Sequence, residues 1–194
     1  MGILVVFLSL HEWMLWRGVT LFLNDLGSIG GLSLGPQEVG FAQGTVGTLM
    51  LMVGVMAGMA LVERGRWGRW LWPMLLALTL PDALMLYLAY RMPSDILPVC
   101  LCVGLESLFA GFGMAGLLAY FFGYGKGRGM EVHASVCVTL IVVSACIAGV
   151  LTGFMQDYFG FRRFFLLVLL LALFALLLAL FAWVQSRKRR VMSA

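Results

Sequence analysis

The sequence predicts an all-α integral membrane protein, with six transmembrane helices arranged as two inverted three-helix repeats. The 194-residue chain is 62% hydrophobic and only 11% charged, whereas about a quarter of the residues of a soluble domain are charged. Six apolar runs are long enough to cross the hydrocarbon core as helices. Glycines recur at an offset of 95 residues, which corresponds to three of these runs.

The chain forms a single predicted membrane domain, residues 1–194. Its expected spans are residues 2–23, 38–62, 68–90, 96–122, 132–156 and 163–185. The loop before the second span ends with Gly35, Pro36 and Glu38, which suit the cap, first and third positions of a helix. Short polar turns separate the later spans.

Basic residues fall unevenly on the two sides of the predicted spans. One side receives nine of them: Arg64, Arg66, Arg69, Lys126, Arg128, Arg187, Lys188, Arg189 and Arg190. The other side receives three: Arg91, Arg162 and Arg163. The positive-inside rule therefore predicts a multi-pass protein of the cytoplasmic (inner) membrane with both termini in the cytoplasm.

The repeat gives the two halves opposite orientations. Under the shift of 95 residues, Gly54 and Gly58 fall on Gly149 and Gly153. Because a repeat contains three spans, the second repeat enters the membrane from the other face, as in many secondary transporters. Spans two and five carry small-residue stripes suited to close helix packing. Their glycines are Gly40, Gly44, Gly47, Gly54, Gly58, Gly149 and Gly153.

Ionisable side chains occur near the middle of spans one and four. Glu12 and Glu106 each lie about 15 Å into their helices, and Glu106 superposes on His11 in the repeat. Since ionisable groups inside membranes are by default functional, we expect Glu106 to be a protonatable cavity residue. The alternative is a protonated acid that bonds a neighbouring helix. Glu12 and His11 are further candidates, but they point about 100° apart and are not expected to face one cavity together.

Two other charged residues lie within spans. Arg17 is a candidate for binding an anionic substrate group or for pairing with Glu12. Stacking on Trp13, or extension of the side chain to the interface, remains open. Asp82 follows Pro81, which kinks a helix and frees a carbonyl. We expect Asp82 to satisfy that break, a structural role.

Charged residues beyond the glycines of spans two and five are candidates for gates or latches. Asp157 and Arg162 are placed to form an ion pair that joins neighbouring helices in one state. Glu63 and Arg66 occupy the loop after span two. The alternative is an ordinary turn with solvated charges, because exposed pairs contribute only ~0–1 kcal/mol.

The residues argue against enzymatic, metal and nucleic-acid functions. The four cysteines lie in apolar runs, and the Cys100 to Cys102 spacing fits neither a zinc site nor a redox pair. No HExxH or GxSxG motif is present, so we expect no catalytic residue, no metal and no cofactor. The chain lacks a basic face with interleaved aromatics, and no nucleic-acid partner is expected.

Two segments resemble a known family. "GLSLGPQEVGFAQGTVGTLMLMVGVMAGMALVERG" resembles the eighth helix and following loop of major facilitator superfamily transporters, and "GVLTGFMQDYFGFRRFF" is similar to the end of their eleventh helix. The order of "FLND", "WLWPM", "VGLESLFAGFGMAG" and "VHAS" looks most like the muropeptide-permease (AmpG-like) branch. The resemblance covers nearly the whole chain as a C-terminal six-helix half. The loop "ERGRWGRW" departs from the family's Asp-Arg-x-Gly-Arg order.

The resemblance implies a secondary-active transporter, or half of one. Such a protein moves a polar organic solute, for example a cell-wall sugar-peptide, by alternating access coupled to protons. The implied partners are the lipid bilayer, the solute, protons, and either a missing N-terminal half or a second copy in a homodimer. The alternatives are a non-transporting interaction subunit, a truncated remnant or a membrane enzyme.

Overall fold

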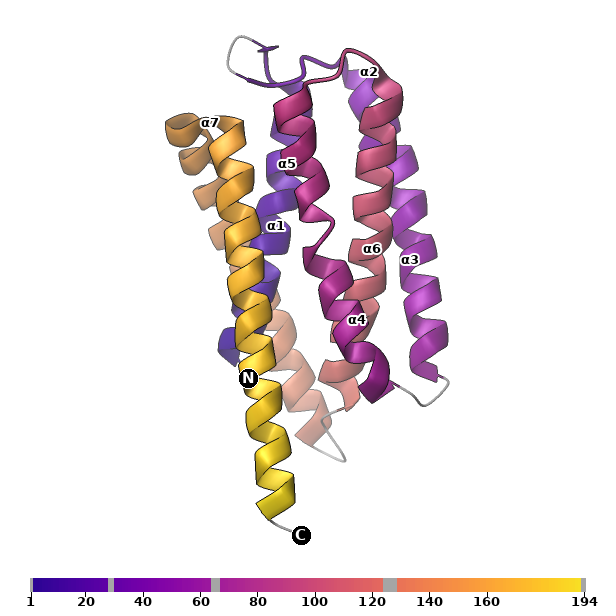
Figure 1. The fold of residues 1–194 in the computed structure, drawn as a ribbon, viewed down its shortest axis with the longest axis vertical. Helices are drawn as coiled ribbons and strands as arrows, with labels where there is room; N and C mark the ends of the chain where they lie inside the picture. Colours follow the sequence, from indigo (N-terminus) through magenta and orange to yellow (C-terminus); the bar gives the residue numbers. More distant parts are fainter. Residues whose placement is uncertain (1, 28–29, 64–66, 124–128, 193–194) are drawn as a thin grey trace.

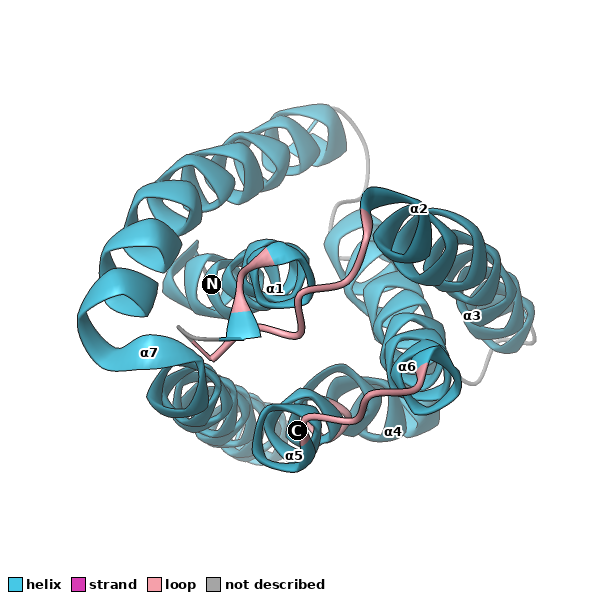
Figure 2. Ribbon diagram, turned by 90° about the horizontal axis from the view of Figure 1, so that it is seen from above, coloured by secondary structure: helices cyan, strands magenta, loops and turns pink. Residues whose placement is uncertain are grey.

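The computed structural model describes residues 2–27, 30–63, 67–123 and 129–192, and all regular structure within these ranges is helical. The elements are α1 (Gly2–Asn24), α2 (Pro36–Val39), the π-helix η2 (Gly40–Gly47), α3 (Thr48–Leu61), α4 (Trp67–Thr79), α5 (Asp82–Arg91), α6 (Ile96–Gly123) and α7 (Gly129–Met192). Figure 1 shows them as an up-and-down bundle. Seen from above, α1 lies near the centre, with α7 on one side and α4, α5 and α6 on the other (Figure 2).

The second expected span is one continuous rod made of α2, η2 and α3. It begins as the sequence predicts, with Gly35 as the cap and Pro36 in the first turn. The Glu38 carboxylate accepts a hydrogen bond from the Gly35 amide at 2.9 Å. The middle of the rod is a π-helix of 8 residues, a rare geometry that occurs frequently at functional sites.

The third expected span is broken into α4 and α5. Proline has no amide hydrogen and its ring clashes with the preceding turn, so Pro81 interrupts the helix. The break falls between Thr79 and Asp82. The upper part of this rod, α5, ends at Met92, whose left-handed backbone (φ 43°) closes the helix.

A single glycine turns the chain between the last two expected spans. At Gly160 the backbone leaves helical geometry (φ 72°, ψ 164°) inside α7. Figure 1 shows that α7 rises before this point and descends after it. The descending part packs on α1, where Phe22 makes edge contacts with the rings of Phe161 and Phe165. Gly18 leaves room for the Phe164 ring, which a methyl group would strike.

Replacing Gly160 by alanine is expected to destabilise the protein by ~1–3 kcal/mol, because its φ and ψ values are essentially restricted to glycine. A methyl group at this position would meet no atom within 4 Å, so the cost comes from the backbone alone. The check is the unfolding temperature in detergent, with Gly153→Ala as a matched control. Gly153 is helical with open space around it and should tolerate the methyl group. Equal unfolding temperatures for the two variants would contradict the prediction.

The helices identify a multi-pass membrane protein. Four stretches of the described chain are long and apolar enough to cross a membrane: Pro36–Leu61, Trp72–Arg91, Ile96–Ala119 and Ser135–Leu180. The last has 46 residues and contains the turn at Gly160. Helix α1, which carries two charged residues and a histidine, is not among the four stretches found in this part of the chain.

Candidate functional site

Three helices bring ionisable side chains together inside the bundle. His11 and Glu12 come from α1, Asp82 from the start of α5, and Glu106 from α6. His11 is 0% exposed, Asp82 2% and Glu106 4%, and the Glu12 side chain is 12% exposed. We call these four residues the acid–histidine cluster.

The His11 ring connects two carboxyl groups of the acid–histidine cluster. Its Nδ1 lies 3.3 Å from the Phe7 carbonyl, one turn earlier in α1. A carbonyl accepts only, so Nδ1 carries hydrogen and donates this bond. The opposite atom, Nε2, lies 3.6 Å from Glu12 Oε2 and 3.9 Å from Asp82 Oδ2. One imidazole nitrogen therefore faces two carboxyl groups at distances just beyond direct hydrogen bonds.

Glu106 completes the cluster from the third helix. Its Oε2 accepts a hydrogen bond from the Ser107 hydroxyl at 3.3 Å. When ionised, it would repel the carboxylates of both Glu12 and Asp82. Ser107 in turn lies against Gly47 of η2, where a methyl group would be 3.2 Å from the hydroxyl oxygen. The π-helix thus packs on the residue that holds Glu106.

Every member of the acid–histidine cluster has a buried polar atom without a hydrogen-bond partner in the described structure. These atoms are His11 Nε2, Glu12 Oε2, Asp82 Oδ2 and Glu106 Oε1. Buried polar groups are nearly always hydrogen-bonded, and an exception calls for an explanation. An isolated buried charge is so costly that such groups neutralise instead. Three carboxyls and one imidazole can therefore hold, share and release protons as a unit.

Two sequence-based expectations concern this cluster. Asp82 was expected to satisfy the break at Pro81, but its carboxyl lies beside His11 Nε2. A signal in the sequence was available, because broken helices near mid-membrane mark binding sites in transporters. His11 and Glu12 were expected not to face one cavity together, and this stays a prediction. Their side chains approach each other to 3.6 Å.

Arg17 lies apart from the acid–histidine cluster. It is exposed, and its guanidinium lies against α7, where a methyl on Gly149 would be 3.2 Å from Cζ. The expected pairing with Glu12 is wrong for this structure, because neither of the described ion pairs involves Arg17. The ring contact of Trp13 is an edge contact with Trp16 at 6.3 Å.

The structure places the candidates for gates and latches in different surroundings. Arg162 does not pair with Asp157 among the described residues; its Nε donates to the Ala89 carbonyl at 3.3 Å. Its guanidinium also lies 5.5 Å from the centre of the Tyr90 ring. Arg162 thus joins α7 to α5 through a backbone acceptor and a ring. Asp157 and Glu63 are exposed. The remaining candidate, Arg66, lies outside the described residues.

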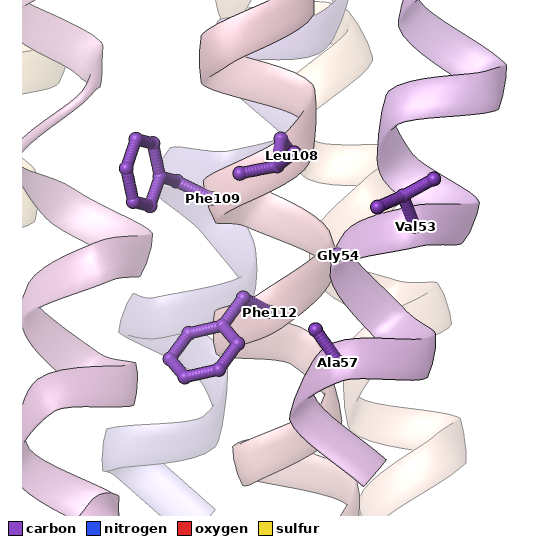
Figure 3. A pocket seen from close by; sticks show the side chains of 6 residues that line it. All are labelled: Val53, Gly54, Ala57, Leu108, Phe109 and Phe112. Atoms are coloured by element: carbon purple, nitrogen blue, oxygen red, sulfur yellow. The ribbon is translucent and has the colours of Figure 1, made fainter. Parts of the chain in front are cut away.

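Some glycines of the two stripes lie at helix contacts, and others lie beside open space. Gly54 and Gly58 let α3 approach α6, where added methyl groups would strike Leu108 and Ala115. Figure 3 shows Gly54 at this crossing, beside an apolar groove of ≈ 150 Å³ between the two helices. Gly47 and Gly149 also lie against neighbouring side chains. The packing role expected for the other three is not seen, because open space surrounds them: Gly40, Gly44 and Gly153.

The fold and the acid–histidine cluster define a helical, multi-pass membrane protein with a buried group of proton-binding side chains. Within residues 2–27, 30–63, 67–123 and 129–192, no group of three or more histidine, cysteine or acidic side chains is arranged to hold a metal ion. No protein-family model, curated protein or solved structure matches the chain.

Proposed function

We propose that the chain is a proton-coupled secondary-active transporter, or the C-terminal half of one. It moves a polar organic solute, such as a cell-wall sugar-peptide, across the cytoplasmic membrane by alternating access. The observation that carries this proposal is the acid–histidine cluster, in which four ionisable side chains from three helices meet with unpartnered polar atoms.

The cluster suits a coupling role because protonation changes the forces between helices. Asp82 and Glu106 stand on different helices, and both act electrostatically on Glu12 of α1. Adding or removing a proton changes the repulsion between the carboxyls and hence the preferred packing of α1, α5 and α6. A ligand that binds one arrangement of these helices better then shifts proton binding as well, by linkage.

The glycine contacts support six spans built as an inverted repeat. Gly54 lies against Phe112 of α6, and Gly149 lies against Arg17 of α1. Gly149 follows Gly54 by 95 residues, and Phe112 follows Arg17 by the same number. A two-fold axis relating the repeats would pair these residues in this way. Together with the basic loops, the repeat favours both termini in the cytoplasm.

The test measures solute-dependent proton movement in membrane vesicles from the source organism. Native vesicles include any partner half or second copy. Vesicles with the gene deleted are the control. A disaccharide-peptide fragment of peptidoglycan is added, and a trapped pH dye follows the internal pH. We expect a pH change that depends on both the solute and the gene. Solute uptake without proton movement would overturn the coupling, and identical responses with and without the gene would overturn the transport function.

A further inference from the structure

Arg17 is an exposed charged side chain near the C-terminal end of α1. Neither ion pair of the described residues includes it. The residues around it on α1 are Trp16 and Thr20, which are also exposed. Charged residues within membrane-spanning helices almost always face the bundle interior or a water-filled cavity rather than lipid.

The position of the guanidinium along the bundle follows from its neighbours on α7. It lies against Gly149, whereas Gln156 donates a 2.6 Å hydrogen bond to Asp25 at the end of α1. Seven residues of helix separate Gly149 from Gln156, so the guanidinium lies about 10 Å from that end of α1. Helical side chains also tilt toward the N-terminus of their helix, which here leads away from the same end.

Polar side chains and exposed glycines lie near Arg17, on α1 and on the neighbouring π-helix. Thr20 is one turn further along α1, and its hydroxyl lies 3.1 Å from the Trp16 carbonyl and 3.0 Å from the Gln43 side-chain amide in the π-helix. Because the amide nitrogen carries two hydrogens, Gln43 keeps at least one N–H donor beyond this contact in either orientation of the amide. Gly40 and Gly44 flank Gln43 with no atom within 4 Å of a built methyl group. A guanidinium and a side-chain amide are therefore both accessible on this side of the bundle, and the two exposed glycines leave the surface beside the amide uncovered.

We propose that Arg17, assisted by Gln43, binds a carboxylate or phosphate group of the transported solute. The proposal rests on the proposed transport function for the solute, but the anion site stands on its own geometry. A guanidinium forms paired hydrogen bonds with such oxyanions. Arg17 follows His11 on the same helix at a distance of about 9 Å along the axis. A shift of α1 therefore moves the anion site and the acid–histidine cluster together.

The test is anion binding to the purified full chain in a neutral detergent, followed by tryptophan fluorescence, since exposed Trp16 adjoins Arg17. The probes are N-acetylmuramic acid, which has a carboxylate, and N-acetylglucosamine, which lacks one. We expect a saturable change with the acid alone. Arg17→Gln should weaken its binding at least tenfold, Arg17→Lys and Gln43→Ala less, and the exposed control Arg91→Gln not at all.

Several results would overturn the anion site. Equal responses to both sugars would do so, as would binding that Arg17→Gln does not affect. A response to phosphatidylglycerol alone would assign Arg17 to a lipid headgroup. Loss of an oligomer or of a co-purifying partner with Arg17→Gln, without anion binding by the parent, would assign it to an intermolecular ion pair. Arg17-dependent anion binding without proton movement would leave the anion site standing and overturn proton-coupled transport. Proton movement without such binding would do the reverse.

Discussion

Glu106→Gln is expected to reduce solute-dependent proton movement to the background of gene-deleted vesicles and to leave a folded, somewhat more stable protein. Glutamine keeps the size of the side chain and its contact with Ser107 but cannot release a proton. Glu106 Oε1 is buried without a hydrogen-bond partner among the described residues, and a neutral amide costs less to bury at such a place than an ionised carboxylate. Removal of a carboxyl from the cluster also relieves its interactions with Glu12 and Asp82.

The two expected changes have opposite signs, which separates a functional role from a structural one. Proton movement is measured in the vesicles described above, and the unfolding temperature is measured in detergent, where we expect a rise of a few degrees. Asp82→Asn should behave like Glu106→Gln, because both carboxyls act electrostatically on Glu12. Asp95→Asn, on the exposed turn before α6, is the control. A lower unfolding temperature with unchanged proton movement would assign Glu106 to packing alone.

Gly54→Ala is expected to destabilise the protein by ~1–3 kcal/mol or more, since overpacking of a close helix crossing forces the backbones apart. The added methyl group would strike the carbonyl of Leu108 and lie 3.0 Å from the Phe112 amide nitrogen. Both are backbone atoms of α6, so no side-chain rotation can make room. The groove beside Gly54 (Figure 3) offers no relief, because the added methyl group would meet backbone atoms of α6.

The same crossing provides a second variant and a matched control. Gly111→Ala, on α6, should destabilise by a similar amount because its methyl group would strike the Leu51 carbonyl of α3. Gly44→Ala lies on the same rod as Gly54 but has open space around it, so its unfolding temperature should be unchanged or higher. The measurement is thermal unfolding of the three variants in one detergent. If Gly54→Ala and Gly44→Ala unfold at the same temperature, the close approach of α3 and α6 contributes nothing to stability.

The sequence by itself determined the class of the protein and where several of its helices start, break or turn. Apolar runs of sufficient length predict membrane helices because the hydrocarbon core accepts backbone only when its hydrogen bonds are satisfied internally. Gly35, Pro36 and Glu38 predicted the helix start that the structure contains. The gap expected between residues 156 and 163 contains the turn at Gly160. These features depend on neighbours within one helical turn, so local chemistry is sufficient to predict them.

Only the tertiary structure decided which polar groups meet. His11 and Asp82 are 71 residues apart in the chain, and their approach depends on how α1 packs beside the broken α4–α5 rod. The same packing places Arg17 against Gly149 of α7 and leaves Gly40 facing open space while Gly54 contacts α6. A sequence pattern gives the face of a helix on which a residue lies. Which helix covers that face depends on the three-dimensional packing of the whole bundle, which no local rule contains.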